Sequence, residues 1–445
     1  MKVLLLFSFL LPVVLLAQNV AAGGRHSLAI CSDSTARAWG YNGFGQLGDG
    51  TIQEKHTGVP VAGITGIAQV AGGLFHSLFV KSDGTVWSCG RNTLGPLGNG
   101  TTTNSPTVVQ VTGLSGIVRA AGGGEHSLFV KNDGTVWACG ANASGQLGDG
   151  TNVNKHTAVP VNGLTGVVQV AGGAEFSLFL KNDGTVWACG HNGYGQYGNG
   201  SNASSKVPVQ VGGLSDIIQI SAGEWHSVFV KRDGTVFSAG RNQYGQLGDG
   251  TTVDRNLAAM INTLSGVVQA ETGGIHTVFV RQNGSVLSCG LNSGGNNDGQ
   301  LGDGTIVDKH VPVSVIPAWG GKKIVRAEAT REHSLYVTES GEVWASGRNN
   351  YGQLGTGAFT NANAPTPISS AAVCQTLLVS APESGNGADG SIFSPNPFST
   401  YTTLRLDPGI DRVDISVFNA VGQLVRHLEN RSGPSVVLNR DGLPN

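Results

Sequence analysis

Short apolar runs separated by polar turns recur along most of the chain, and they predict β-strands. In one stretch, apolar or alternating residues occupy 117–120, 127–131 and 135–139, and a fourth short run follows at 159–161. Asn132-Asp133-Gly134 between the second and third runs is typical of a hairpin turn, because glycine tolerates the positive φ angle that such turns need. No window shows the period of a long helix with caps. The pattern therefore predicts four antiparallel strands in about 50 residues.

This stretch is one of seven similar repeats. The motif Gly-Gly-x-x-His-Ser-Leu-Phe-Val, then Asp-Gly-Thr-Val-Trp, then Gly-x-Asn-x-x-Gly-Gln-Leu-Gly recurs at intervals of mostly 50 residues. Such repeats build solenoids, propellers or arrays, in which each unit buries its apolar face on its neighbours. We predict an all-β, seven-bladed β-propeller, because a closed ring leaves no long strand edge bare. A solenoid is the alternative, but neither the first nor the last repeat resembles a polar end cap.

The motif closely resembles the regulator of chromosome condensation repeat over roughly residues 20–373, and this resemblance implies a seven-bladed propeller, which we place at 18–375. The repeats depart from the family pattern at a few positions. Phe176 replaces a histidine, Pro96 replaces the loop glutamine, and Phe237 and Leu287 replace the strand tryptophan. The resemblance also implies guanine-nucleotide exchange on a small GTPase. Nuclear relatives use a protruding wedge hairpin for this, and the chain has no insertion of comparable size.

The N-terminus is expected to direct export. Lys2 precedes an apolar run that ends at Ala17, which is the length of a signal-peptide core and short for a membrane span. We therefore predict a signal peptide at 1–17 and an extracellular or bacterial cell-surface location, with no membrane span in the mature chain.

Beyond the repeats, a polar linker is expected at 376–390, and alternating residues at 403–406 and 413–418 predict further strands. Within 391–445, the segments 394–398, 415–423 and 442–444 resemble the C-terminal sorting domain of the bacterial type IX secretion system. This resemblance implies a partner in the secretion machinery. It also implies an incomplete domain, since such domains usually continue with one more strand. An ordinary small β-sandwich is the alternative.

Composition argues against nucleic acid as a partner. Charged residues make up 13% of the chain and the net charge is −2, so no basic surface is available to attract phosphate groups.

The cysteines divide into two groups. Cys89, Cys139, Cys189 and Cys289 share one position of the third strand, so they lie in different blades, too far apart for disulfides, and are expected to be buried thiols. Cys31 and Cys374, by contrast, align near the outer ends of paired strands at the two ends of the ring, where those ends should complete one another. We predict a disulfide between them in an oxidising compartment.

The repeated polar residues are expected to serve the fold. Ligands of one metal must converge on one point, whereas the histidines of a ring are spread around a circle. We therefore expect each histidine to hydrogen bond to nearby backbone, each loop asparagine to satisfy buried backbone groups, and each Asp-Gly-Thr to form a turn. The strand tryptophans are expected between blades. No catalytic, cofactor-binding or metal-binding residue is predicted.

Variation between repeats is a better guide to function. In each repeat, we expect the residue before the histidine and the residue after the third-strand glycine to lie at the same end of the blade. One candidate ligand-binding face would then carry these residues: Arg25, Tyr41, Phe75, Arg91, Glu125, Glu175, His191, Trp225, Arg241, Glu332 and Arg348. Aromatic residues and arginine dominate interface hot spots. Neutral variation of exposed positions is the alternative. A longer loop at 293–299 should lie on the same face.

The sequence therefore predicts a monomeric, secreted, non-enzymatic propeller that binds an unknown protein or glycan and needs no cofactor. A secreted enzyme acting on polysaccharide is a further alternative. It would need convergent acids, and only Glu125, Glu175, Glu224 and Glu332 are even loosely placed for that.

Overall fold

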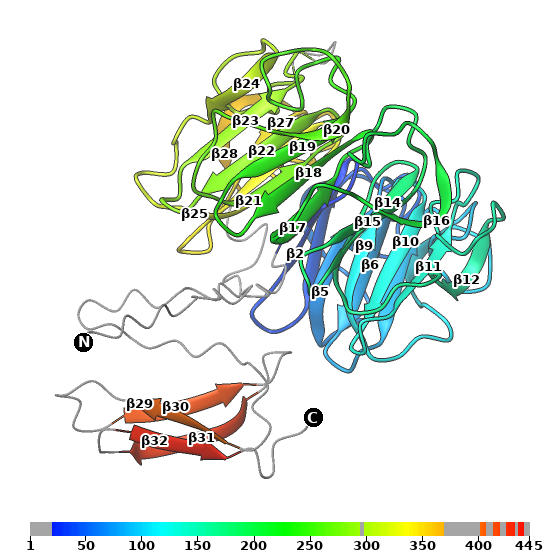
Figure 1. The fold of residues 1–445 in the computed structure, drawn as a ribbon, viewed down its shortest axis with the longest axis vertical. Coiled ribbons are helices and arrows are strands. Elements are labelled where there is room, and N and C mark those ends of the chain that lie inside the picture. Colours follow the sequence, from blue (N-terminus) through cyan, green and yellow to red (C-terminus); the bar gives the residue numbers. More distant parts are fainter. Residues whose placement is uncertain are drawn as a thin grey trace. The chain divides into compact units, whose positions relative to one another are not determined.

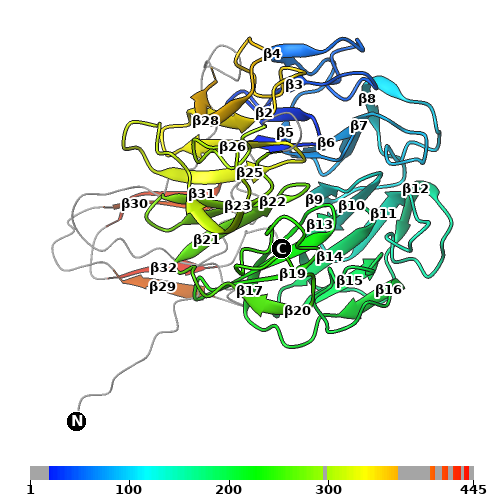
Figure 2. The same cartoon turned by 90° about the horizontal axis from the view of Figure 1, so that it is seen from above.

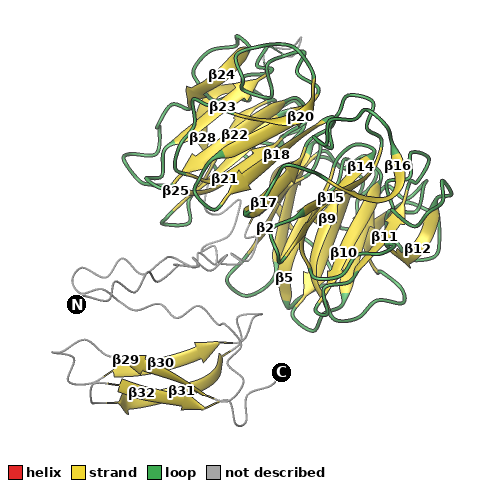
Figure 3. Ribbon diagram, viewed as in Figure 1, coloured by secondary structure: helices red, strands yellow, loops and turns green. Residues whose placement is uncertain are grey.

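The computed structural model describes residues 20–293 and 298–368, together with the backbone of four strands after residue 400. The described residues form strands, turns and loops, and no helix occurs among them (Figure 3). The strands before residue 369 and those after residue 400 belong to two different units.

Residues 20–293 and 298–368 form seven four-stranded sheets, and each sheet consists of four consecutive strands in chain order. These sheets are the predicted blades, numbered one to seven here. Figure 2 shows them following one another around a ring, with β2, β5, β9 and β13 nearer the centre than β4, β8, β12 and β16. The prediction of a seven-bladed propeller with four-stranded blades is confirmed.

The strand bounds repeat from blade to blade (Figure 1). Blades one to three contain β1 (Val20–Ala22), β2 (His26–Ile30), β3 (Ala36–Gly40), β4 (Lys55–Pro60), β5 (Ile67–Gly72), β6 (His76–Lys81), β7 (Val86–Gly90), β8 (Ser105–Gln110), β9 (Ile117–Gly122), β10 (His126–Lys131), β11 (Val136–Gly140) and β12 (Lys155–Pro160). Blades four and five contain β13 (Val167–Gly172), β14 (Phe176–Lys181), β15 (Val186–Gly190), β16 (Ser205–Gln210), β17 (Ile217–Ala222), β18 (His226–Lys231), β19 (Val236–Gly240) and β20 (Arg255–Met260). Blades six and seven contain β21 (Val267–Thr272), β22 (His276–Arg281), β23 (Val286–Gly290), β24 (Lys309–Ser314), β25 (Ile324–Ala329), β26 (His333–Thr338), β27 (Val343–Gly347) and β28 (Ala362–Pro367).

The outermost strand of each blade begins earlier than its apolar run suggests. In blade three, β12 covers Lys155–Pro160, whereas the apolar run that predicts it lies at 159–161. Its side chains are exposed or half-buried, because an edge strand packs less fully than the inner strands. Hydrophobicity therefore reports only the end of this strand.

The hydrophobic core lies between the blades. Leu78 and Val80 of blade two pack in one cluster with Phe129 and Cys139 of blade three. The ring closes in the same way, because Val20 and Trp39 of blade one share a cluster with Leu335 and Ile368 of blade seven. The two ends of the repeat region thus meet across a blade junction, and each end contributes to a complete sheet of its own.

The strand tryptophans lie at these junctions, as predicted, but they are only partly buried. Trp137 packs against the cluster between blades two and three, and Trp187 against the next cluster. Trp39, which occupies the cysteine position in blade one, is fully buried. Its Nε1 donates to the Gln353 carbonyl oxygen at 3.0 Å and so links blade one to blade seven.

The second unit contains four described strands: β29 (Tyr401–Arg405), β30 (Val413–Phe418), β31 (Leu424–Arg431) and β32 (Ser435–Asn439). Antiparallel pairs form between β29 and β32 and between β30 and β31. Strands at the two predicted places are confirmed, whereas the β-sandwich and the sorting domain stay predictions. The signal peptide at 1–17, the linker at 376–390, Cys374 and the motifs at 394–398 and 442–444 lie outside the described residues.

Candidate ligand-binding face

The two variable positions meet in every blade. The residue after the third-strand glycine donates its backbone N–H to the carbonyl oxygen of the residue before the histidine, for example Tyr41 to Arg25 at 2.9 Å and Arg241 to Trp225 at 2.9 Å. The same bond joins Arg91 to Phe75, His191 to Glu175, and Arg348 to Glu332. The predicted face residues are therefore brought together in pairs at one end of the blades.

Side chains from blades seven, one and two form a continuous group, here called the aromatic–arginine cluster, which comprises Arg25, Tyr41, Phe44, Phe75, Arg91, Arg348 and Tyr351. Tyr41 lies with its ring centroid 5.0 Å from that of Tyr351 and 6.2 Å from that of Phe75. The Arg91 guanidinium lies 5.3 Å from the Phe44 ring, and that of Arg25 lies 5.3 Å from the Tyr351 ring. Cation–π contacts of this kind hold arginine in place without covering it.

A second group joins blades four and five. The Trp225 ring lies 5.1 Å from that of His191 and 5.7 Å from that of Tyr194. The Arg241 guanidinium lies 5.3 Å from the Tyr194 ring. All four side chains are half-buried, so each rests on its neighbours and keeps one surface accessible.

The acids of the face are mostly paired with arginine. Glu125 forms an ion pair with Arg91 at 2.5 Å, and Glu332 lies 3.3 Å from Arg25 and 3.1 Å from Arg348. Glu175 is the exception among the predicted acids, because it is exposed and accepts a hydrogen bond from the Ser144 hydroxyl at 2.8 Å.

A pocket of about 420 Å³ opens on this face at blades five to seven. Its lining includes Glu224, Asp298, Gln300 and Arg331, beside apolar side chains such as Ile275. Arg331 and Glu224 form an ion pair at 2.9 Å. Burial raises the pKa of Asp298 to about 6, against the lowering effect of Arg348.

Sequence reasoning missed several residues of this face. Phe44, Tyr194, Tyr244 and Tyr351 occupy the second position before the loop glutamine. That position is aromatic in four repeats, and this variation could have drawn attention to it. Arg331, two positions before its histidine, is charged where five other repeats have small or apolar residues, whereas Glu224 at the same position in blade five was considered above only as an acid for catalysis. Asp298 occupies the second position before Gln300 in blade six, where the other repeats have uncharged residues, and this departure could also have drawn attention to it.

The histidines link successive blades, which corrects the expectation of bonds to nearby backbone. The Ser177 hydroxyl donates to the Gln146 carbonyl oxygen at 2.7 Å, so it accepts from His126 Nε2, which lies 2.9 Å away. The same link closes the ring between His333 and Ser27 at 2.8 Å. Burial lowers the pKa of His126 to about 3. The buried ring is therefore neutral and serves the fold.

A glycine three positions before the histidine makes room for this ring. A Cβ on Gly123 would lie 2.1 Å from His126 Cε1. In blade four, Phe176 occupies the same place over Gly173, where a Cβ would lie 2.0 Å from Phe176 Cε1. The phenylalanine thus fills the slot without forming the link.

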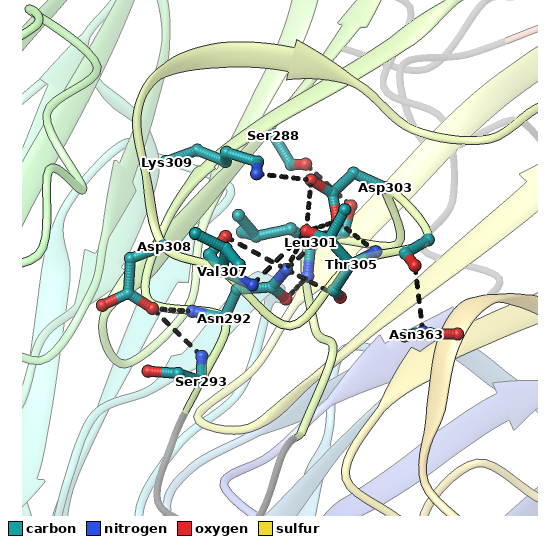
Figure 4. Close-up of polar contacts among 11 residues, drawn as sticks. Ser288, Asn292, Ser293, Leu301, Asp303, Thr305, Val307, Asp308, Lys309 and Asn363 are labelled. Atoms are coloured by element: carbon teal, nitrogen blue, oxygen red, sulfur yellow. Dashed lines mark hydrogen bonds and ion pairs between the residues drawn. The ribbon is translucent and has the colours of Figure 1, made fainter.

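The asparagines hold the loops between the third and fourth strands, as predicted. In blade six, Asn292 Oδ1 accepts from the Leu301 N–H at 3.0 Å, and its Nδ2 donates to the Thr305 carbonyl oxygen at 3.0 Å (Figure 4). Asp303 caps the turn by accepting from the Thr305 N–H at 2.9 Å and pairs with Lys309 at 3.4 Å. The Asp-Gly-Thr segments are therefore turns.

The shared-position cysteines, Cys89, Cys139, Cys189 and Cys289, are free and buried thiols, as predicted. Cys31 is 8% exposed at the junction of blades one and seven. Its predicted disulfide with Cys374 stays a prediction, since Cys374 lies outside the described residues.

Within 20–293 and 298–368, no three histidine, cysteine or acidic side chains are grouped as metal ligands would be. The same described segments hold no helix that is long and apolar enough to cross a membrane.

The repeats and the ring define a propeller of one particular family. The model of the RCC1-like domain matches residues 97–384, and models of the regulator of chromosome condensation (RCC1) repeat match 17–46, 67–95 and 38–80. The chain belongs to this family.

Two curated relatives match over a short segment. The chain is 45% identical to Protein RCC2 homolog of Xenopus laevis and 42% identical to Protein RCC2 of Homo sapiens, each over 74 residues. These alignments span 17% of the chain and 14% of each relative, so the chain covers about a seventh of their length.

Solved structures with the same fold are more distant in sequence. Human WBSCR16 has a TM-score of 0.64 at 24% identity, over 71% of this chain and 85% of that one. Prp20p of Saccharomyces cerevisiae, described with binding properties to Gsp1p and histones, has a TM-score of 0.64 at 22% identity, over 75% of this chain and 85% of that one. At these identities the likeness shows the fold alone.

Proposed function

We propose that this protein is a non-enzymatic binding scaffold, exported to the cell surface or medium, whose candidate face docks a protein ligand through the aromatic–arginine cluster. The observation that carries the proposal is this cluster itself, in which four aromatic rings and three arginines from blades seven, one and two contact one another in one half-buried group. Large aromatic side chains and arginine supply most of the binding energy at protein interfaces, and prior ordering reduces the entropy cost of docking.

The pairing of the acids favours binding over catalysis. A glycoside hydrolase needs two carboxyl groups that face the same bond, whereas Glu125, Glu224 and Glu332 each contact an arginine. A glycan ligand is the alternative to a protein, since aromatic rings can also stack on sugars.

Export is proposed from the sequence of the two termini. The test is expression in a bacterium that has type IX secretion. The protein should then reach the surface or medium, and mass spectrometry should find a mature N-terminus near residue 18. Cytosolic protein that retains Met1 would contradict export and would leave the binding proposal to its own test.

Binding is tested on arrays of defined extracellular proteins and glycans probed with the full chain. Replacement of Phe75 and Arg91 by alanine should weaken binding to any protein retained by the wild type by about 100-fold, the typical effect of losing hot-spot residues. Arg232→Ala is the matched control, because Arg232 is exposed on the turn between β18 and β19, at the opposite end of the blades. Equal binding by both variants would contradict the assignment of this face.

A second candidate function rests on the family. Prp20p, which shares the fold, is described as binding Gsp1p. If the present chain acts as an exchange factor, purified protein should accelerate the release of a fluorescent guanine nucleotide from a small GTPase. A release rate unchanged by the full chain would exclude this function for the GTPase tested.

A further inference from the structure

One carboxyl group in the pocket at blades five to seven lacks a close ion-pair partner. Three carboxyl groups line it, and two of them are paired: Glu224 with Arg331 at 2.9 Å, and Glu332 with Arg25 and Arg348 at 3.3 and 3.1 Å.

The third carboxyl group, Asp298, forms no ion pair with any described residue. Asp298 is nevertheless buried, because only 3% of the residue is exposed. Its hydrogen bond from Asn361 Nδ2 is long, at 3.5 Å. A buried carboxylate without a close partner is unfavourable, and folded proteins retain such groups mainly at sites that bind something.

A second acceptor in the same pocket lacks a donor. In five blades the loop glutamine accepts a backbone N–H with its Oε1, for example Gln246 from Tyr244 at 3.0 Å and Gln353 from Tyr351 at 2.9 Å. In blade six the loop between Asn292 and Gln300 is longer, and this bond is absent. Gln300 is 1% exposed, and its Oε1 has no hydrogen-bond partner.

The remaining walls are suited to an aliphatic chain. Ile275, Leu291 and Tyr244 line the pocket together with the two unsatisfied acceptors. A ligand that fits must offer N–H donors, a positive charge for Asp298 and an apolar stem. Lysine and arginine side chains have this combination, because their methylene groups pack on apolar surface while the charged end donates hydrogen bonds.

We propose that this pocket receives a lysine or arginine side chain of a partner protein, with its charged end donating to Asp298 and Gln300 and its stem against Ile275 and Leu291. This proposal rests on the proposed function, because it takes the candidate face as the surface on which the partner docks. The partner's cation would then be an anchor separate from the aromatic–arginine cluster.

The proposal implies a pH dependence. Burial raises the pKa of Asp298 to about 6, with Arg348 lowering it and Glu332 raising it. The other charged groups at the pocket, Glu224 and Arg331, are paired with each other. Since the cation needs the carboxylate form, binding should weaken as the pH falls from 7.5 to 5.

The test uses the full chain and four small probes followed by ligand-observed NMR. Nα-acetyl-lysine methylamide and Nα-acetyl-arginine methylamide carry the charge, and the Nε-acetylated lysine analogue and the citrulline analogue are neutral. At least one cationic probe should bind at pH 7.5, whereas the neutral analogues should bind at least about tenfold more weakly, because charged hydrogen bonds are the stronger ones.

Two variants locate the site. Asp298→Asn should weaken the cationic probe about tenfold or more. Leu291→Arg should abolish binding, because it places a guanidinium in the pocket at the position that holds Arg91, Arg241 and Arg348 in other blades. Glu54→Gln is the control: it removes one negative charge from an exposed side chain outside the pocket and should leave binding unchanged.

The outcomes separate this proposal from the proposed function. Equal binding of neutral and cationic probes, or binding unchanged in both Asp298→Asn and Leu291→Arg, would overturn the cation pocket. Because the probes need no partner protein, a positive result stands even if the Phe75 and Arg91 variants leave array binding intact. Thermal melting of each variant checks that the ring is folded.

Discussion

At the scale of single residues, the first position of the second strand holds an aromatic ring in every blade, a histidine in six blades and Phe176 in blade four. His126 and Phe176 fill equivalent slots, each fully buried over a glycine. His126 bonds to Ser177, whose hydroxyl also bonds to the Gln146 carbonyl oxygen. The hydroxyl therefore keeps a partner if the imidazole is replaced.

His126→Phe should lower the free energy of unfolding at pH 7.5 by about 1 kcal/mol, the net value of one buried hydrogen bond. The difference should shrink or reverse below pH 6. Burial holds the pKa of folded His126 near 3, so in acid only the unfolded wild type takes up this proton, which destabilises the wild type alone. Urea unfolding of both proteins at pH 7.5 and 5.5 checks this. A difference that stays constant with pH would contradict a buried neutral imidazole.

The histidine position also shows which features of the structure the sequence could predict. The repeat predicted that the histidine serves the fold, because Phe176 replaces it. Its partner lies 51 residues away in the next blade, and only knowledge of how blades pack would reveal it. The burial of Asp298 was beyond prediction for a different reason. Asp298 is equivalent to Phe44 and Tyr351 when counted back from the loop glutamine, and comparison with those partly exposed rings does not show that its carboxyl group is buried.

At the scale of elements, strands were predicted where both sides of a strand are buried, as in β10, and poorly where one side faces solvent, as in β12. The loop between the third and fourth strands has little apolar content, and a single amide organises it. Asn142 Oδ1 accepts from Leu147 N–H at 3.0 Å, and its Nδ2 donates to the carbonyl oxygens of Thr151 and Val153, each at 3.2 Å.

Asn142→Ala should therefore lower the free energy of unfolding by about 2–4 kcal/mol, because several buried backbone groups lose their partner at once. Asn152→Ala is the control in the same loop. Asn152 is exposed and makes one hydrogen bond, to the Ala143 carbonyl oxygen at 2.9 Å, so its loss should cost under about 1 kcal/mol. Chemical denaturation measures both. Similar losses in the two variants would show that the buried amide is not the organising group.

Tryptophans between the blades and those on the candidate face should differ in their effect on stability. Trp137→Ala should cost about 2 kcal/mol, below the range of about 3–5 kcal/mol for a fully buried aromatic residue, because Trp137 is half-buried against the core. Trp225→Ala should cost less stability, since its contacts are with His191 and Tyr194 on the face. Thermal melting compares them, and a larger loss for Trp225 would place it in the core.

At the scale of the whole molecule, the buried histidines should set the response to acid. Burial lowers the pKa of each histidine that begins the second strand of a blade to about 3 or 4: His26, His76, His126, His226, His276 and His333. Folding is therefore favoured above the ordinary histidine pKa of about 6.5 and is weakened as the pH falls toward 4. Each histidine changes the free energy of unfolding by at most about 1.4 kcal/mol per pH unit.

Three buried acids act in the opposite direction, and they are fewer than the six histidines. Burial raises the pKa values of Glu271, Glu328 and Asp298, so protonation of these groups favours the folded state as the pH falls. The melting temperature should fall steeply between pH 6.5 and 4.5. A melting temperature that is constant or rises over this range would show that the acids dominate. In His126→Phe, the stability should depend less steeply on pH, because about one proton fewer is taken up on unfolding.

Closure of the ring depends on its two ends, and a covalent link there would act on the whole molecule. Cys31 lies in the cluster that joins blades one and seven, close to Val20 and Ile368. The repeat register predicts that Cys374 lies beside it, and export would allow the pair to oxidise. Such a disulfide would close a loop of several hundred residues and stabilise the ring by about 4–5 kcal/mol in the chain-entropy model. Non-reducing peptide mapping of secreted protein should recover the Cys31–Cys374 peptide, and reduction or Cys31→Ser should lower the melting temperature. Free thiols at both positions would exclude the link and leave closure to the packing of Trp39 and its neighbours.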